Sequence, residues 1–190
     1  MTPDQAVERA RALARSGRRR VLGLCGEPGA GKTTLSHLID EQLGDKCAVV
    51  PMDGFHLAQG QIERLGRADR KGAPDTFDSW GFLSLVQRLA AAREPVIYAP
   101  MYQHGFGEPI AGAIPVPKNV PLVIVEGNYL LLDDEPWSLL APLLAQAWYV
   151  NVAPQLRMKR LIRRHIDAGK SPDYATTWAH GPDERNAALI

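Results

Sequence analysis

Residues 26–33 read Gly26-Glu27-Pro28-Gly29-Ala30-Gly31-Lys32-Thr33. This stretch fits the pattern G-x-x-x-x-G-K-[ST] at every position. The apolar run 21–25 precedes it, and residues 33–43 follow with apolar side chains at helical spacing. A strand, a glycine-rich loop and a helix in this order surround a phosphate with backbone N–H groups and the positive helix end. The stretch therefore predicts a phosphate-binding loop rather than a chance glycine turn.

The side chains of this loop suit a nucleoside triphosphate. Lys32 brings a positive charge to the β- and γ-phosphates, and the Thr33 hydroxyl is placed to bind Mg²⁺. We therefore assign residues 26–33 and the following Thr34 to binding ATP.

The remaining chain alternates apolar strands with helices. We expect further strands at 48–52, 96–98, 122–125 and 148–152, and helices at 3–16, 136–145 and 154–168. Asp78 is expected to cap another helix that runs to about Arg93. The stretches 59–77 and 100–117 are rich in Gly, Pro and polar residues and are predicted as long loops, the first with room for a short helix. The pattern predicts a three-layer α/β fold of the P-loop NTPase type, with a mainly parallel sheet and a small helical lid.

Length and composition limit the alternatives. A chain of 190 residues with 45% hydrophobic and 23% charged residues is expected to fold as one domain, 1–190, with an N-terminal helix in 1–17 and a lid in 154–170. The balance of 22 basic against 21 acidic residues argues against a nucleic-acid binder. No apolar run suits a membrane span or a secretory signal, so we expect no membrane insertion and a cytoplasmic location. Cys25 and Cys47 show no CxxC pattern and predict buried thiols.

Two carboxylates stand at predicted strand ends. Glu126 closes the run 122–125, where a P-loop enzyme holds Mg²⁺ or its water shell, although alone it could be an ordinary turn residue. Asp53 follows the strand at 48–52 and, in a parallel sheet, would face the γ-phosphate. If that phosphate moves to an alcohol, Asp53 can orient the hydroxyl and take its proton. An Asp-Gly turn without chemistry is the alternative.

The helix at 154–168 is basic. Arg160 and Arg164 are four residues apart, so they share a face and can clamp the triphosphate as charge develops on it. The alternative is a solvated basic face. The two long loops supply candidate walls for an acceptor: Arg70, Lys71, Asp75, Asp78, Tyr98, Tyr102 and His104.

Five ordered blocks resemble a known family. They are the P-loop, Pro51-Met52-Asp53-Gly54-Phe55-His56, Arg70-Lys71-Gly72-Ala73-Pro74-Asp75-Thr76-Phe77-Asp78, Val125-Glu126-Gly127-Asn128-Tyr129-Leu130, and Arg160-Leu161-Ile162-Arg163-Arg164-His165. Together they resemble the P-loop small-molecule kinases that include uridine kinase, phosphoribulokinase and the bacterial type of pantothenate kinase. The combination is most similar to a bacterial branch called fructose-transport-system kinases or nucleoside/nucleotide kinases.

The resemblance implies ATP-dependent phosphorylation of a hydroxyl. It implies Asp53 as base, Thr33 and Glu126 at Mg²⁺, and Arg160 and Arg164 in a mobile lid. The same blocks add His56 and Asn128 to Lys71, Asp78, Tyr102 and His104 as acceptor candidates. Two positions depart from the family pattern. Gln103-His104 in the second loop prevents a direct transfer of the acceptor pocket, and Ile166-Asp167 stands where an Arg-Asp pair often follows the lid block.

Three functions remain open at this point. The first is a kinase that phosphorylates a sugar such as fructose, a nucleoside or a pantothenate-like alcohol. The second is a regulatory NTPase switch, against which the chain has no Asn-Lys-x-Asp block for reading guanine. The third is an inactive binding module, which intact Lys32, Thr33, Asp53 and Glu126 disfavour. The oligomeric state is open, and analogy with relatives favours a homodimer.

Overall fold

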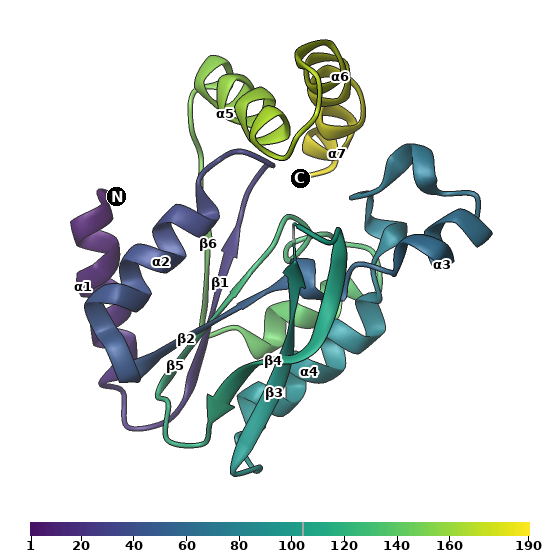
Figure 1. The fold of residues 1–190 in the computed structure, drawn as a ribbon. Helices are drawn as coiled ribbons and strands as arrows, with labels where there is room; N and C mark the ends of the chain where they lie inside the picture. The colour runs from purple at the N-terminus through teal and green to yellow at the C-terminus, as the bar shows by residue number, and fades with distance from the viewer. Residues whose placement is uncertain (104) are drawn as a thin grey trace.

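A four-stranded parallel sheet in the order β2-β5-β1-β6 forms the centre of the computed structural model, which describes residues 1–103 and 105–190. Its strands are β1 (Arg20–Cys25), β2 (Cys47–Pro51), β5 (Leu122–Glu126) and β6 (Gln146–Tyr149). The helices are α1 (Pro3–Ala14), α2 (Lys32–Leu43), α3 (Gln59–Arg64), α4 (Ser79–Ala91), α5 (Pro154–Asp167), α6 (Pro172–Trp178) and α7 (Glu184–Leu189). The predicted three-layer α/β arrangement is confirmed (Figure 1).

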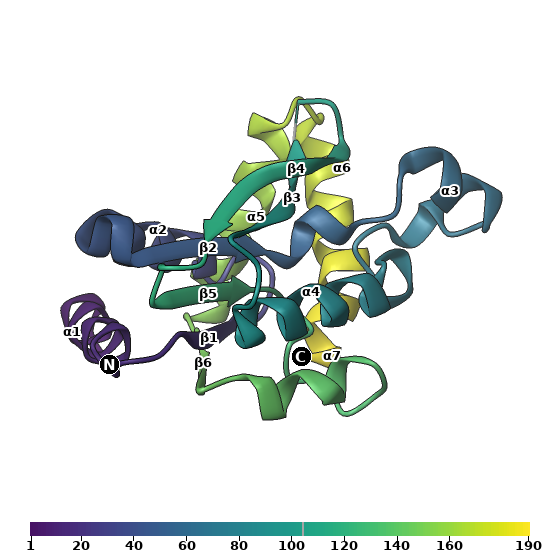
Figure 2. The same cartoon turned by 90° about the horizontal axis from the view of Figure 1, so that it is seen from below.

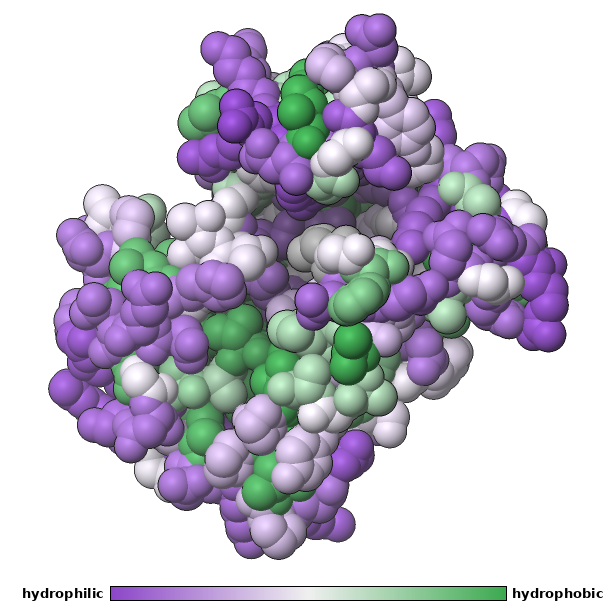
Figure 3. Space-filling model, in the orientation of Figure 1, coloured by the Kyte–Doolittle hydropathy of each residue, from purple (hydrophilic) through white to green (hydrophobic). Residues whose placement is uncertain are grey.

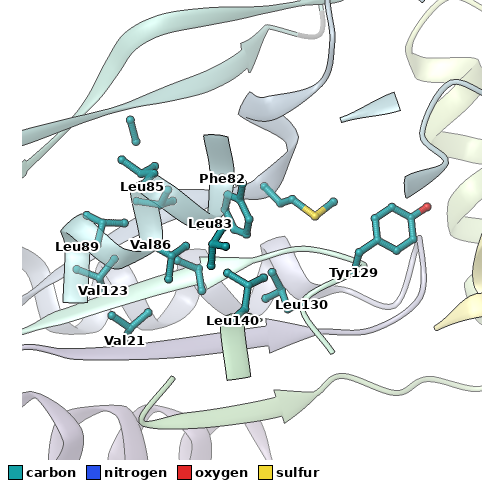
Figure 4. Close-up of a cluster of buried hydrophobic side chains, with 14 of the residues drawn as sticks. Val21, Phe82, Leu83, Leu85, Val86, Leu89, Val123, Tyr129, Leu130 and Leu140 are labelled. Atoms are coloured by element: carbon teal, nitrogen blue, oxygen red, sulfur yellow. The ribbon is translucent and has the colours of Figure 1, made fainter. Parts of the chain in front are cut away.

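Alternating side chains of the strands build a core on each face of the sheet. In β5, Val123 and Val125 pack toward α4, whereas Leu122 and Ile124 pack toward α1 and α2. This is the two-residue period of a strand that is buried on both faces. Figure 4 shows the α4 side, where Val123 lies among side chains of that helix.

The parallel register brings three strand ends together. Glu126, the last residue of β5, is opposite Leu24 of β1 on one side and Pro51 of β2 on the other. Ligands of parallel α/β sheets bind beyond these carboxyl ends. The sheet thus places the phosphate loop, Glu126 and the segment after β2 at one edge.

The prediction of a loop at 100–117 is wrong. β3 (Val96–Gln103) pairs antiparallel with β4 (Glu108–Pro117), and this hairpin is a separate two-stranded sheet rather than part of the parallel one. Prolines suggested a loop because they lack an N–H group, but both strands of a two-stranded sheet are edges, where proline is tolerated. Figure 2 shows the hairpin beyond β2, at the end of the sheet opposite β6.

Other segments also differ from the prediction, and several element ends are shifted by one or two residues. The stretch 59–77 begins with the short helix α3, for which the prediction leaves room. The helical segment expected at 136–145 is a 3₁₀ helix, Trp137–Leu143, and Pro142 within it has no N–H group to continue an α-helical ladder. The strand expected at 148–152 is β6, which begins two residues and ends three residues earlier. The stretch after residue 169, where the sequence predicts no element, forms α6, a π-helical turn at Ala179–Asp183, and α7.

The C-terminal helices form a unit above the sheet. Figure 1 shows α5, α6 and α7 together beyond the carboxyl end of β1. Helix α5 lies within the region 154–170, whose role as a lid stays a prediction. No helix in the part of the chain that the structure describes is long and apolar enough to cross a membrane.

Candidate active site

The loop between β1 and α2 leaves the start of α2 open. Gly31 is the N-cap residue of α2 with φ of 100°, a left-handed conformation that favours glycine. No side chain of the described residues caps this helix. Its first backbone N–H groups are therefore left for another acceptor, at the helix end that attracts anions.

Lys32 folds back over the same loop. Its Nζ donates to the carbonyl oxygens of Gly26 at 3.0 Å and Glu27 at 3.1 Å, and to Oδ1 of Asn128 at 2.7 Å. Burial lowers the pKa of Lys32 from its ordinary value, and the charges of Asp53 and Glu126 oppose this shift. The lysine thus lies within electrostatic reach of both predicted carboxylates.

Glu126 is held by two hydroxyl groups. Its Oε1 accepts from Oγ1 of Thr33 at 2.9 Å and its Oε2 from Oγ of Ser36 at 2.8 Å. Ser36 also lies 3.0 Å from the carbonyl oxygen of Thr33, but its single hydrogen serves one acceptor at a time and the carboxylate is the stronger one. Glu126 is only 7% exposed, so these bonds compensate its burial.

Ser36 was missed in the sequence, although a signal was present. It lies three residues after Thr33 on α2, so the two hydroxyls share one helix face. A serine at this spacing can reach any carboxylate that Thr33 reaches.

The chemistry of Thr33 and Glu126 fits a magnesium ion. No group of three His, Cys, Asp or Glu side chains forms a metal cage in residues 1–103 and 105–190. Mg²⁺ needs no such cage, because it keeps several waters and binds through one or two protein oxygens and the substrate phosphates. A hydroxyl and a carboxylate side by side are oxygen donors of this kind.

Asp53 lies in the 3₁₀ turn Met52–Phe55 that follows β2. Among the charges that counter the lowering of the Lys32 pKa, that of Asp53 has the largest effect. The pKa of Tyr102 is raised mainly by burial, then by the charge of Glu108, and then by that of Asp53. A methyl group built on Gly54 would lie 2.3 Å from the carbonyl oxygen of Pro100. The hairpin strand β3 therefore packs directly on the turn that carries Asp53.

Helix α5 brings Arg160 and Arg164 toward the phosphate loop. Nη1 of Arg160 lies 3.4 Å from a methyl group built on Gly31, and the charge of Arg164 contributes to lowering the pKa of Lys32. Arg163 is different: it is 77% exposed and paired with Asp167. Figure 3 shows the surface hollowed between the α5–α7 unit and the body of the molecule.

Arg157 is the second residue whose position the sequence did not reveal. Its side chain is 4% exposed, with Nε 2.9 Å from Oε2 of Glu27 and Nη2 2.6 Å from Oε2 of Glu184. Leu161, four residues later, is fully buried. An apolar residue at that spacing was the available signal that Arg157 shares the buried face of α5.

Three predicted acceptor residues meet at the hairpin. The ring of His56 lies 4.7 Å from that of Tyr102 between ring centres, and Nζ of Lys71 lies 5.7 Å from the Tyr102 ring centre. The Tyr102 hydroxyl and the Lys71 ammonium both donate to the carbonyl oxygen of Gly107, at 2.8 Å and 3.1 Å. Nδ1 of His56 is 2.8 Å from the carbonyl oxygen of Asp53. The cluster therefore adjoins the Asp53 turn.

The other acceptor candidates have separate surroundings. Asn128 contacts Lys32, and Asp78 caps α4 by accepting from the backbone N–H of Gly81 at 2.9 Å. Arg70 and Asp75 pair with each other on the surface. His104 lies outside the described residues. The acceptor roles of these residues stay predictions.

Comparison with known proteins identifies relatives. No family model matches the chain. A candidate uridine kinase of Schizosaccharomyces pombe is 33% identical over 175 residues, covering 87% of this chain and 74% of that protein. The ATP-dependent kinase-like protein notR' of Aspergillus versicolor is 37% identical over 131 residues, covering 65% and 76%. The crystal structure of a candidate fructose transport system kinase from Silicibacter sp. TM1040 superposes with a TM-score of 0.86 and 34% identity, covering 100% of this chain and 93% of that one.

These relatives share sequence over most of both chains, and the solved one shares the fold. They confirm the resemblance that the five sequence blocks indicated. The chain belongs to the uridine kinase-like family of P-loop, ATP-dependent kinases and is a phosphotransferase.

Proposed function

We propose that this kinase transfers the γ-phosphoryl group of ATP to a hydroxyl of a small metabolite, with Asp53 as the general base. The observation that carries the proposal is the placement of three groups at one sheet edge. Lys32 and Thr33 begin α2, Thr33 donates to Glu126 at the end of β5, and Asp53 follows the neighbouring strand β2. One edge of the sheet thus holds Lys32 to bind phosphates, Asp53 to accept a proton from an alcohol, and Glu126 to bind a metal ion.

In the proposed reaction the acceptor oxygen forms a bond to the γ-phosphorus while the bond to the β,γ-bridging oxygen breaks. The hydroxyl proton passes to the carboxylate of Asp53, and ADP is the leaving group. Lys32, Arg160 and Arg164 stabilise the negative charge of the phosphates as it shifts toward ADP. Thr33 and Glu126 would hold Mg²⁺, which neutralises phosphate charge when bound.

The acceptor is proposed to lie between the Asp53 turn and the hairpin. His56, Lys71 and Tyr102 offer hydrogen-bonding groups and aromatic rings there. Such a wall suits a polar alcohol, and the candidates are a sugar such as fructose, a nucleoside such as uridine, and a pantothenate-like compound.

An ATP-to-ADP turnover assay with Mg²⁺ tests the proposal. Sugars, nucleosides and pantothenate are each supplied to the protein, with a no-acceptor control and with Lys32→Ala as the inactive control. Turnover stimulated by one acceptor, with formation of its phosphate ester, is the expected result. Acceptor-independent hydrolysis, or ATP binding without turnover, would favour the regulatory switch.

Two accompanying proposals concern the state of the protein. A cytoplasmic location is tested by cell fractionation, and a homodimer by sedimentation of the purified protein. A monomer at all concentrations would refute the dimer without affecting the catalytic proposal.

A further inference from the structure

The phosphate loop contains a negatively charged side chain, that of Glu27, although it is proposed to bind negatively charged phosphates. Glu27 is the second residue of the loop, and its carbonyl oxygen accepts from Nζ of Lys32, so its backbone borders the proposed phosphate cradle. Its side chain is 30% exposed. A carboxylate at this place repels the phosphates that the loop is proposed to bind, unless its charge is compensated.

Arg157 lies against this carboxylate. Its guanidinium is almost fully buried and contacts Oε2 of Glu27 through Nε and Oε2 of Glu184 through Nη2. Nε and Nη1 of Arg157 make no hydrogen bond with any described residue. The contact with Glu27 is therefore an approach of opposite charges rather than an aligned hydrogen bond.

The backbone of α5 packs closely on the loop that carries Glu27. A methyl group built on Gly29 would lie 3.0 Å from the carbonyl oxygen of Arg157 and 2.9 Å from Cγ of Leu161. The first half of α5 thus packs on the loop itself. Burial of the Arg157 side chain, which is 4% exposed, and its second contact with Glu184 hold the guanidinium beside Glu27.

We propose that Arg157 is a positioning residue for the nucleotide site: it neutralises Glu27 and directs its carboxylate away from the phosphates. This inference rests on the proposed binding of ATP at the loop. Arg157 acts through Glu27 and touches no reacting atom, which distinguishes it from Arg160 and Arg164 on the same helix.

A purely structural role predicts something else. Arg157 also joins α5 to α7 through Glu184, and it could serve only to dock these helices. In that case removal of Glu184 would be as harmful as removal of Arg157, and removal of Glu27 would bring no benefit. The two roles therefore differ in the sign of their effects on ATP affinity.

Calorimetric measurement of ATP binding distinguishes the positioning role from the purely structural role. It compares the wild-type chain with the variants Arg157→Met, Glu27→Gln, Glu27→Gln/Arg157→Met and Glu184→Gln. Arg163→Met is the matched control, because it removes an exposed arginine from the same helix. We expect Arg157→Met to weaken ATP binding about tenfold, the scale of a partly screened charge next to a polyanion. The double variant should return close to wild-type affinity, because it removes one charge of each sign.

Glu27→Gln alone should bind ATP more tightly, and Glu184→Gln should bind it no less tightly than the wild type. Added salt should reduce the defect of Arg157→Met, since screening weakens repulsion but does not repair packing. If Arg157→Met does not fold, the Glu27→Gln variant still decides, because ATP binding by it that is no tighter than that of the wild type would overturn the proposal. A double variant as weak as Arg157→Met would overturn it as well.

Failure of this inference can be told apart from failure of the proposed function. A wild-type chain that does not bind ATP refutes the proposed function. A wild-type chain that binds ATP, with no restoration in the double variant, refutes only the role of Arg157.

Discussion

Leu161 of α5 packs directly on Gly29 of the phosphate loop. Cγ of Leu161 would lie 2.9 Å from a methyl group at Gly29, closer than real side chains approach, and Leu161 is fully buried by this contact and its neighbours. The helix that carries Arg160 and Arg164 therefore packs directly on the loop whose phosphates these arginines are proposed to contact.

Gly29→Ala should separate α5 from the loop. We expect it to cost about 1 kcal/mol for the left-handed backbone and a further 1–3 kcal/mol for the crowding, with loss of ATP binding. Gly17→Ala is a matched control, because Gly17 has φ of 82° against 80° at Gly29 and open space around it. Denaturant unfolding of both variants checks this, and equal losses of stability would contradict the contact.

Ser36→Ala should disturb Glu126, the carboxylate proposed to hold Mg²⁺. It leaves Oε2 of Glu126 without its hydroxyl partner, so we expect a stability loss of about 1–3 kcal/mol and a higher Mg²⁺ requirement. The measurement is calorimetric ATP binding with and without Mg²⁺. Ser36→Thr, which keeps the hydroxyl, should retain the Mg²⁺ dependence, and an unchanged dependence in Ser36→Ala would exclude the positioning role.

The lowered pKa of Lys32 makes ATP binding dependent on pH. Burial holds this pKa below 10.5 in the free protein, and phosphate oxygens favour the charged amine, so the pKa rises on binding. Between the two pKa values ATP binding should take up a proton, and affinity should fall as pH rises. Calorimetry in alkaline buffers of different ionisation heat measures the uptake. Lys32→Met should lack it, whereas Lys46→Met, an exposed lysine, should keep it.

Asp53→Asn should abolish most transfer while the fold stays intact. Loss of a general base reduces turnover by about 10²- to 10⁴-fold, whereas the neutral amide has the same size and lies outside the phosphate loop. ATP affinity and the unfolding midpoint are measured beside turnover. Full acceptor phosphorylation by this variant would remove Asp53 from the base role.

The sequence predicts the phosphate half of the molecule well, for physical reasons. The glycine pattern of residues 26–33 admits few backbone conformations, and the runs 21–25 and 122–125 are apolar enough to require burial on both faces. Once these strands are parallel, Asp53 and Glu126 must come to one edge. Their placement follows from topology and needs no long-range information.

The remaining features depend on packing that a linear pattern does not encode. The sequence does not predict β4, because Pro109, Pro115 and Pro117 are typical of loops, although an edge strand tolerates prolines. In the sequence Arg157 is one of four arginines on a basic helix, and only the position of α5 on the loop distinguishes its buried guanidinium from the exposed one of Arg163. The acceptor wall depends on how the hairpin meets the Asp53 turn.

The separation of the hairpin from the central sheet has an evolutionary consequence. β3 and β4 share no strand pairing with β2, although β3 packs on Gly54 beside Asp53. On the proposed function, mutations along the hairpin can reshape the wall that meets the acceptor without altering the register that aligns Glu126 with the phosphate loop. A lineage built on this plan can exchange one alcohol for another while it inherits the phosphoryl-transfer apparatus unchanged.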